Sequence, residues 1–233
     1  MESLLTLPAG EFAAAELVLR VAAVLVAATA TVLGLSTMCV VLRDRFVLIL
    51  SSVALGCSAA FLGSVWGAWK GAFELAGSDY CVTGLPLAPG DRIVAWAFGV
   101  PVLLVCLGLL RLDLSGKPFR SLCGYALTLA LVSPFSHLGA CALFLVCVVQ
   151  FRIPGQPLNQ WKSVWKAEKT LLTALGSIAG GFLLVGMGQL FPLGGTPGAM
   201  LVRGEIYQSV VVILSLVVPA LALLVITLRR SRS

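Results

Sequence analysis

Long runs of apolar residues recur along the chain, separated by short polar or charged segments. Several runs are long enough to cross a hydrocarbon core of about 30 Å as a helix, which takes roughly 20 residues. None alternates apolar and polar residues as a strand of a membrane β-barrel does. In lipid, backbone polar groups must be satisfied within helices or closed barrels. The pattern therefore predicts an all-α, polytopic helical bundle in a membrane.

Charged residues between the runs set the expected topology. The region from Phe119 to Phe151 is interrupted by residues Ser133 to His137, so it forms either one long helix or two short ones. Two helices place most of the 16 basic residues at inner helix ends, whereas one helix places most of them outside. The positive-inside rule therefore favours seven spans over six, with the amino terminus outside and the carboxyl terminus inside. The expected spans, in a single transmembrane domain of residues 1-233, are 13-42, 46-69, 92-111, 119-133, 137-152, 170-191 and 205-228.

Small residues recur at a spacing of four on the second and sixth expected helices. This spacing lets another backbone approach closely. Packing within one bundle and association with partner helices explain the pattern equally well. The residues of these expected helix-packing faces are Gly56, Ala60, Gly63, Gly67, Gly71, Gly176 and Gly180.

Charged residues lie near the outer ends of two expected helices. Glu16 and Arg20 stand one turn apart and can pair, which makes them a candidate intramembrane charge pair. Both also lie close to the helix start, where a charged side chain can reach the lipid headgroups. This is the favoured interpretation. Asp91 and Arg92 begin the third expected helix and are candidate outer-mouth residues.

Proline and tryptophan mark further local features. We expect Pro101, Pro134 and Pro219 to kink or break helices, because proline removes a backbone hydrogen bond. Between residues 154 and 170, two tryptophans share one helical face and lysines the other, which is typical of an interfacial amphipathic segment. A basic start of the sixth helix is the simpler explanation. The interface residues are Trp161, Trp165, Lys162 and Lys166.

Composition agrees with this picture and excludes several functions. The chain is 59% hydrophobic and 11% charged, with a mean hydropathy of +1.04, against about 25% charged residues in soluble proteins. The net charge of +6 comes from residues at helix ends, which indicates topology and not nucleic-acid binding. His137 is the single histidine, and no catalytic motif occurs. We therefore expect no catalytic residues, no metal site, no enzyme activity and no cofactor, with a bound lipid or pigment left open.

The start of the third expected helix resembles that of microbial rhodopsins. Arg92, Trp96, Phe98 and Pro101 are similar to that family's outer arginine, the tryptophan against its chromophore and its mid-helix proline. The seven-span topology with the amino terminus outside is also similar.

Other positions depart from the rhodopsin pattern. The resemblance implies a retinal-bearing lysine near Val218 to Leu221, yet residues 208 to 228 contain no lysine. It also implies a carboxylate counter-ion at Ala95 and a proton donor at Cys106, and small residues replace the aromatic wall of the sixth helix. The resemblance thus implies a chromophore-free relative of rhodopsins.

Three functional hypotheses follow. The leading one is a non-catalytic multi-pass protein, a structural or accessory subunit that packs through its small-residue faces against other transmembrane subunits or further copies of itself. The alternatives are a small transporter or channel built on the kinked helices, with Arg92 steering anions, and a chromophore-free rhodopsin-like protein. Membrane lipid is an expected partner in each case, and nucleic acid is not.

Overall fold

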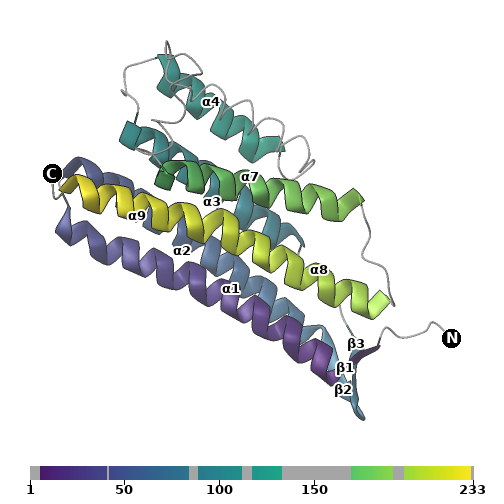
Figure 1. Cartoon of the computed structure of the whole chain (residues 1–233). Coiled ribbons are helices and arrows are strands. Elements are labelled where there is room, and N and C mark those ends of the chain that lie inside the picture. Colours follow the sequence, from purple (N-terminus) through teal and green to yellow (C-terminus); the bar gives the residue numbers. More distant parts are fainter. Residues whose placement is uncertain are drawn as a thin grey trace.

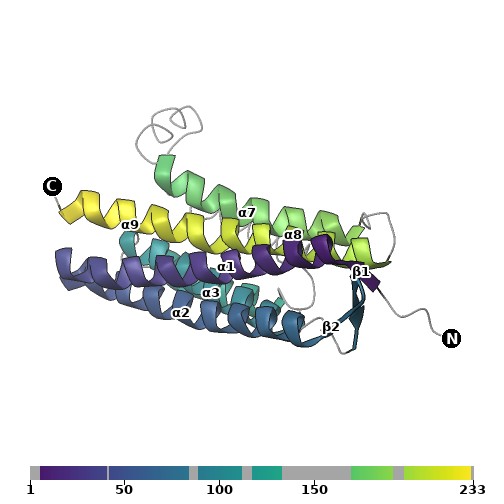
Figure 2. The same ribbon diagram turned by 90° about the horizontal axis from the view of Figure 1, so that it is seen from below.

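The computed structural model describes residues 6–40, 42–83, 89–111, 117–132, 169–190 and 197–231. Their helices run side by side along one common direction, with a small sheet at one end (Figures 1 and 2). The fifth expected span, Pro134 and the segment with Trp161, Lys162, Trp165 and Lys166 lie outside the described residues.

The first two helices form a long antiparallel hairpin. Helix α1 spans Ala9–Ser36 and continues as the 3-10 turn η1 (Thr37–Cys39), and α2 spans Leu42–Gly71. Ser52 of α2 donates a hydrogen bond of 2.7 Å to the Ala30 carbonyl of α1. At the connection, Arg45 Nε donates to the Thr37 carbonyl at 3.0 Å. Polar contacts thus fix the register of two otherwise apolar helices.

The third and the last helices pack against this hairpin, and the other described helices pack against these two. Helix α3 spans Pro89–Arg111 with Pro101 inside it, α4 spans Lys117–Val132 and α7 spans Lys169–Leu190. The Tyr207 hydroxyl of the next helix donates to the Leu184 carbonyl of α7. Helix α1 begins and the last helix ends at opposite ends of the bundle, as an odd number of spans requires (Figure 1).

The last helix is continuous and contains a π-helical turn. It consists of α8 (Pro197–Val212), the π-helix η3 (Ile213–Val217) and α9 (Val218–Ser231). It begins at Pro197 and not near Glu205, since proline fits the first turn of a helix, where its missing N–H is not needed. The π-helical turn directly precedes Pro219, where the ring interrupts the hydrogen-bond ladder.

A three-stranded antiparallel sheet closes the end of the bundle where α1 begins, which we term the outer end. Strands β1 (Thr6–Pro8), β2 (Phe73–Ala76) and β3 (Asp79–Val82) pair in the order β1-β3-β2. The two-residue turn between β2 and β3 has Gly77 at φ 70°, which suits glycine at the first turn position. Gly198 of α8 lies so close to β1 that a Cβ would be 2.9 Å from the Thr6 carbonyl oxygen. The segment between α2 and α3 thus acts as a cap together with the amino-terminal strand.

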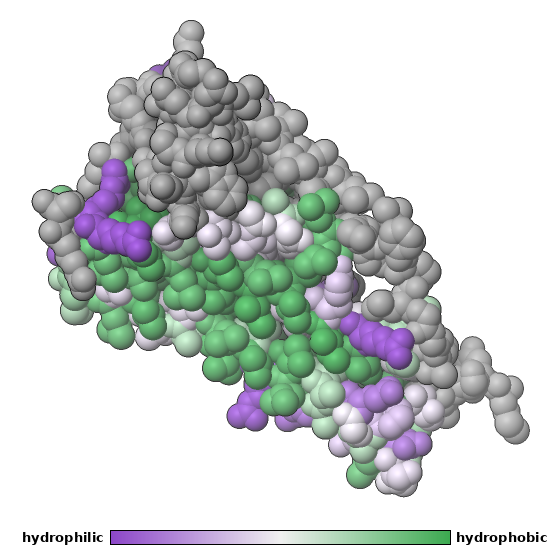
Figure 3. Space-filling model, in the orientation of Figure 1, coloured by the Kyte–Doolittle hydropathy of each residue, from purple (hydrophilic) through white to green (hydrophobic). Residues whose placement is uncertain are grey.

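Apolar side chains fill two clusters and also cover the outside. The larger cluster lies between the helices, and the smaller lies beneath the sheet around Phe12, Trp69 and Phe73. Outward-facing side chains such as Leu17 and Leu127 are 60% and 65% exposed. In Figure 3 this apolar surface runs over the described helices, with hydrophilic residues towards their ends. Three described helical stretches are long and apolar enough to cross a membrane: Ala9–Cys39, Asp44–Gly71 and Gly198–Ser231.

Candidate functional site

The bundle centre is the junction where α3 meets α2 and η3. Trp96 Nε1 donates a hydrogen bond of 2.5 Å to Ser215 Oγ, and Ser215 in turn donates to the Val211 carbonyl at 2.7 Å. Ser58 Oγ of α2 donates to the Ala95 carbonyl of α3 at 2.8 Å. All of these side chains are buried. The polar atoms of the junction therefore satisfy one another, as buried polar groups must.

Gly99 is the point of closest approach in this junction. A Cβ placed on Gly99 would lie 2.7 Å from Leu216 Cδ2 and 2.7 Å from Ser58 Oγ. Leu216 and Ser58 are both 0% exposed. Direct contact between α3, α2 and η3 therefore fills this part of the bundle.

Buried carboxylates lie away from the bundle centre. Among the described residues, the buried charged ones are Asp44 and Glu205. Asp44 lies in the first turn of α2 at the inner end, where its Oδ1 lies 4.0 Å from Arg230 Nη1. Glu205 lies in the outer half of the last helix. Within the described ranges, no group of three or more His, Cys, Asp or Glu residues could hold a metal ion.

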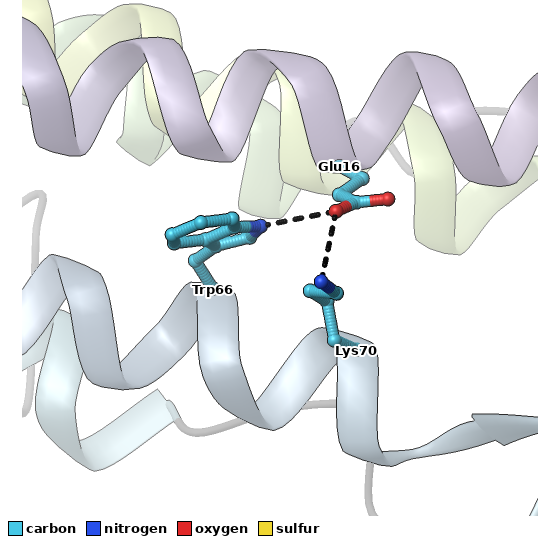
Figure 4. Close-up of polar contacts among 3 residues, drawn as sticks. All are labelled: Glu16, Trp66 and Lys70. Carbon is cyan, nitrogen blue, oxygen red and sulfur yellow. Dashed lines mark hydrogen bonds and ion pairs between the residues drawn. The ribbon is translucent and has the colours of Figure 1, made fainter.

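A second polar cluster lies at the outer end between α1 and α2. Glu16 Oε1 accepts a hydrogen bond of 3.4 Å from Trp66 Nε1 and lies 3.8 Å from Lys70 Nζ (Figure 4). The guanidinium carbon of Arg20 lies 5.8 Å from the centre of the Trp66 ring, and Lys70 Nζ lies 5.6 Å from it. The structure thus brings Glu16 to Lys70 and places Arg20 over the indole. We call these four residues the outer charge cluster.

The small residues of α2 and α7 lie where little packs against them. No described atom comes within 4 Å of a Cβ placed at any of the glycines of the expected packing faces. Ala60 is exposed. The faces are thus open within the described part of the chain. These glycines are Gly56, Gly63, Gly67, Gly71, Gly176 and Gly180.

Asp91 and Arg92 lie in the first turn of α3, at the outer end of the bundle. Their backbone position agrees with an outer mouth, and their side chains are outside the described set. They remain a prediction.

The sequence did not reveal the two serines of the bundle centre. Ser58 and Ser215 sit in apolar runs, where a serine usually bonds a carbonyl of its own helix. One signal could have indicated Ser215: a buried Trp96 needs a hydrogen-bond acceptor for its Nε1–H, and a serine in a neighbouring helix can supply it.

Comparison with solved structures shows that the fold is that of microbial rhodopsins. Xanthorhodopsin, described as a light-driven ion pump with dual chromophore, matches with a TM-score of 0.77 and 15% identity over 99% of this chain and 98% of that one. Thermophilic rhodopsin matches with a TM-score of 0.68 and 18% identity over 98% of both chains. Exiguobacterium sibiricum rhodopsin matches with 0.67 and 14% over 95% of this chain and 98% of that one. No family model and no curated protein matches the sequence.

These similarities confirm the expected seven-helix membrane bundle and the resemblance of α3 to rhodopsins. The chain is an integral, multi-pass membrane protein in contact with lipid. The expectation of no cofactor is wrong for this fold, because xanthorhodopsin carries a dual chromophore.

The residues at the bundle centre do not fit a retinal bound as a Schiff base. Such a bond needs a primary amine, and residues 208 to 228 contain no lysine. The side chain of Leu216 packs against Gly99 instead.

Proposed function

We propose that this chain is a non-catalytic, rhodopsin-fold membrane protein that works without a Schiff-base-bound retinal. The observation that carries the proposal is the contact of Leu216 and Ser58 with Gly99, which occupies the centre of the bundle with side chains of the protein itself. Ala95 supplies no charge beside Trp96, so a protonated Schiff base would lack a counter-ion at the position that the resemblance implies.

The test is reconstitution of the purified protein with all-trans retinal. We expect no red-shifted absorbance band, and no retinyl mass increment after borohydride reduction, which traps a Schiff base covalently. A rhodopsin apoprotein treated in parallel serves as the positive control. A band that disappears on denaturation without a mass increment would show a pigment held without a covalent bond, as the proposal allows. A reduced adduct on a lysine of this chain would refute the proposal.

A second proposal concerns association with another helix through the outer half of α2. Within the described residues nothing packs against Gly56, Gly63 and Gly67, which favours contact with another helix as the reason for this spacing. The inner half of the same helix carries large exposed side chains, with Phe46 61% and Val53 56% exposed. Two parallel copies related by a two-fold axis along the membrane normal would meet at the small residues and diverge at the large ones. Crossings of this kind are typical of small-xxx-small faces.

A bulky substitution on this face tests the second proposal. Gly63→Ile should shift the protein from an oligomer to a monomer in native mass spectrometry and lower energy transfer between labelled copies in lipid bilayers. Leu127→Ile, on the exposed face of α4, is the matched control and should leave the oligomer intact. A wild-type protein that is monomeric in both assays, or a Gly63→Ile variant that keeps the wild-type oligomer, would contradict the proposal.

A further inference from the structure

We propose that the outer charge cluster binds the phosphate of a phospholipid headgroup, with Arg20 and Lys70, which both approach the Trp66 ring, as the cationic groups. Glu16 of α1 faces Trp66 and Lys70 of α2 (Figure 4), and Arg20 of α1 lies near the same Trp66 ring, so two helices build the site. This proposal does not depend on whether the bundle centre binds a retinal.

Depth in the membrane is the first argument. From Arg20 to the end of η1 at Cys39 the helical stretch is about 29 Å long at 1.5 Å per residue. This length matches the hydrocarbon core of about 30 Å. Arg20 therefore lies at the outer boundary of the hydrocarbon, where lipid phosphates are within reach of a long side chain. Towards the membrane centre, α1 presents the exposed apolar side chains Val21 and Val24, at 41% and 57% exposure, to the acyl chains.

The second argument is the geometry of the two cations. Both approach the same indole ring, Arg20 at 5.8 Å and Lys70 at 5.6 Å from its centre. Cation–π attraction thus holds two positive groups close to the same Trp66 ring. Among the described residues, Arg20 has no carboxylate partner, so its planar set of N–H donors stays available to phosphate oxygens.

The third argument concerns the charge of the cluster. Glu16 lies 3.8 Å from Lys70 and neutralises part of its charge, while its other contact is the Trp66 N–H at 3.4 Å. The side chain of Lys70 is 56% exposed, which leaves it free to turn from Glu16 towards a lipid. Two cations and one carboxylate leave a net charge of one, which suits a single phosphodiester.

Lipid binding by native mass spectrometry tests this site. The full-length protein is released from bilayers that contain either phosphatidylglycerol or a glycolipid without phosphate as the probe lipid. We expect retained phosphatidylglycerol and at least fivefold less retained glycolipid. The double variant Arg20→Gln/Lys70→Gln should lose roughly tenfold in phosphatidylglycerol retention, as expected for the loss of charge-assisted hydrogen bonds. The double variant Arg120→Gln/Arg229→Gln is the matched control, since it removes the same charge from exposed sites elsewhere.

A third variant separates headgroup binding from a merely structural ion pair. Glu16→Gln removes the carboxylate that competes with phosphate for Lys70, so it should increase phosphatidylglycerol retention. A structural pair would give unchanged or weaker retention together with a lower unfolding temperature. Equal loss of lipid in both double variants would overturn the proposal. Displacement of the lipid by millimolar inorganic phosphate would also overturn it, because the site would then take the free anion without the lipid.

Discussion

A methyl group added at Gly99 tests whether α3 and η3 are in direct contact at the bundle centre. The Cβ of Gly99→Ala would lie 2.7 Å from both Leu216 Cδ2 and Ser58 Oγ, well inside the contact distance of about 3.5 Å. Leu216 and Ser58 are fully buried, and Ser58 is held by its hydrogen bond to the Ala95 carbonyl, so neither can move aside freely. Overpacking of this kind costs about 1–3 kcal/mol.

The sign of the effect depends on helix propensity as well. Alanine is favoured over glycine in a helix by roughly 0.5–1 kcal/mol. Gly124→Ala, on an exposed face of α4 with no described atom within 4 Å of the added Cβ, measures that gain alone. We therefore expect Gly99→Ala to be less stable than Gly124→Ala by about 1–3 kcal/mol.

A second substitution identifies the neighbour that causes the penalty. Leu216→Ala alone should cost about 2–5 kcal/mol, because it leaves a cavity in the core. In that background, Gly99→Ala should lose most of its penalty, since the larger of the two clashing side chains is gone. The result is a coupling free energy of about 1–3 kcal/mol in a double-mutant cycle.

Unfolding by SDS in mixed micelles, followed by helical circular dichroism, measures the free energy of unfolding of each variant. The reasoning fails if Gly99→Ala is as stable as Gly124→Ala in the wild-type background. It also fails if the effects of the Gly99 and Leu216 substitutions simply add. Either result would mean that a space remains between α3 and η3.

Three further substitutions test other contacts by the same unfolding assay. Ser215→Ala removes the acceptor that lies 2.5 Å from the buried Trp96 Nε1, so it should lower the free energy of unfolding by about 1–3 kcal/mol and shift the tryptophan emission. An unchanged stability would contradict the hydrogen bond. Asp44→Asn removes the carboxylate 4.0 Å from Arg230 and should cost less than about 1 kcal/mol, because that arginine is 45% exposed; a loss that persists undiminished in high salt would argue against an ionic origin. Gly77→Ala forces φ 70° on a residue with a side chain and should cost about 1–2 kcal/mol, and a neutral result would indicate a different turn.

The sequence predicted the class of fold because the signal for it is local. Runs of apolar residues and the charges between them follow from the thickness of the bilayer alone. The resemblance of Trp96 and Pro101 to the third helix of rhodopsins was also visible in one short stretch, and the structural similarity confirms it. Each of these features can be recognised without knowing which helices are neighbours.

The parts that could not be predicted depend on contacts between distant segments. Strand β1 has only three residues, and its pairing with β3 joins segments more than 70 positions apart in the chain. The four-residue spacing of Gly63, Gly67 and Gly71 defines a helix face but not what that face meets, and the structure leaves it open within the described residues. The partner of Glu16 also lies on a distant segment. Arg20 is one helical turn away, yet the ion pair that Glu16 forms is with Lys70 of the neighbouring helix.

The bundle centre explains how a rhodopsin fold can persist without the chemistry of a Schiff base. Trp96 and the π-helical turn η3 face each other across the junction, and a tryptophan in that position needs both apolar contact and one acceptor. Ser215 supplies the acceptor, and Leu216, from the same π-helical turn, supplies apolar volume against Gly99. Since these two neighbouring residues satisfy both requirements, the helices can keep the arrangement seen in rhodopsins with side chains of the protein alone filling the junction. The presence of Trp96 in α3 is therefore explained by packing, and it does not by itself indicate light-driven transport.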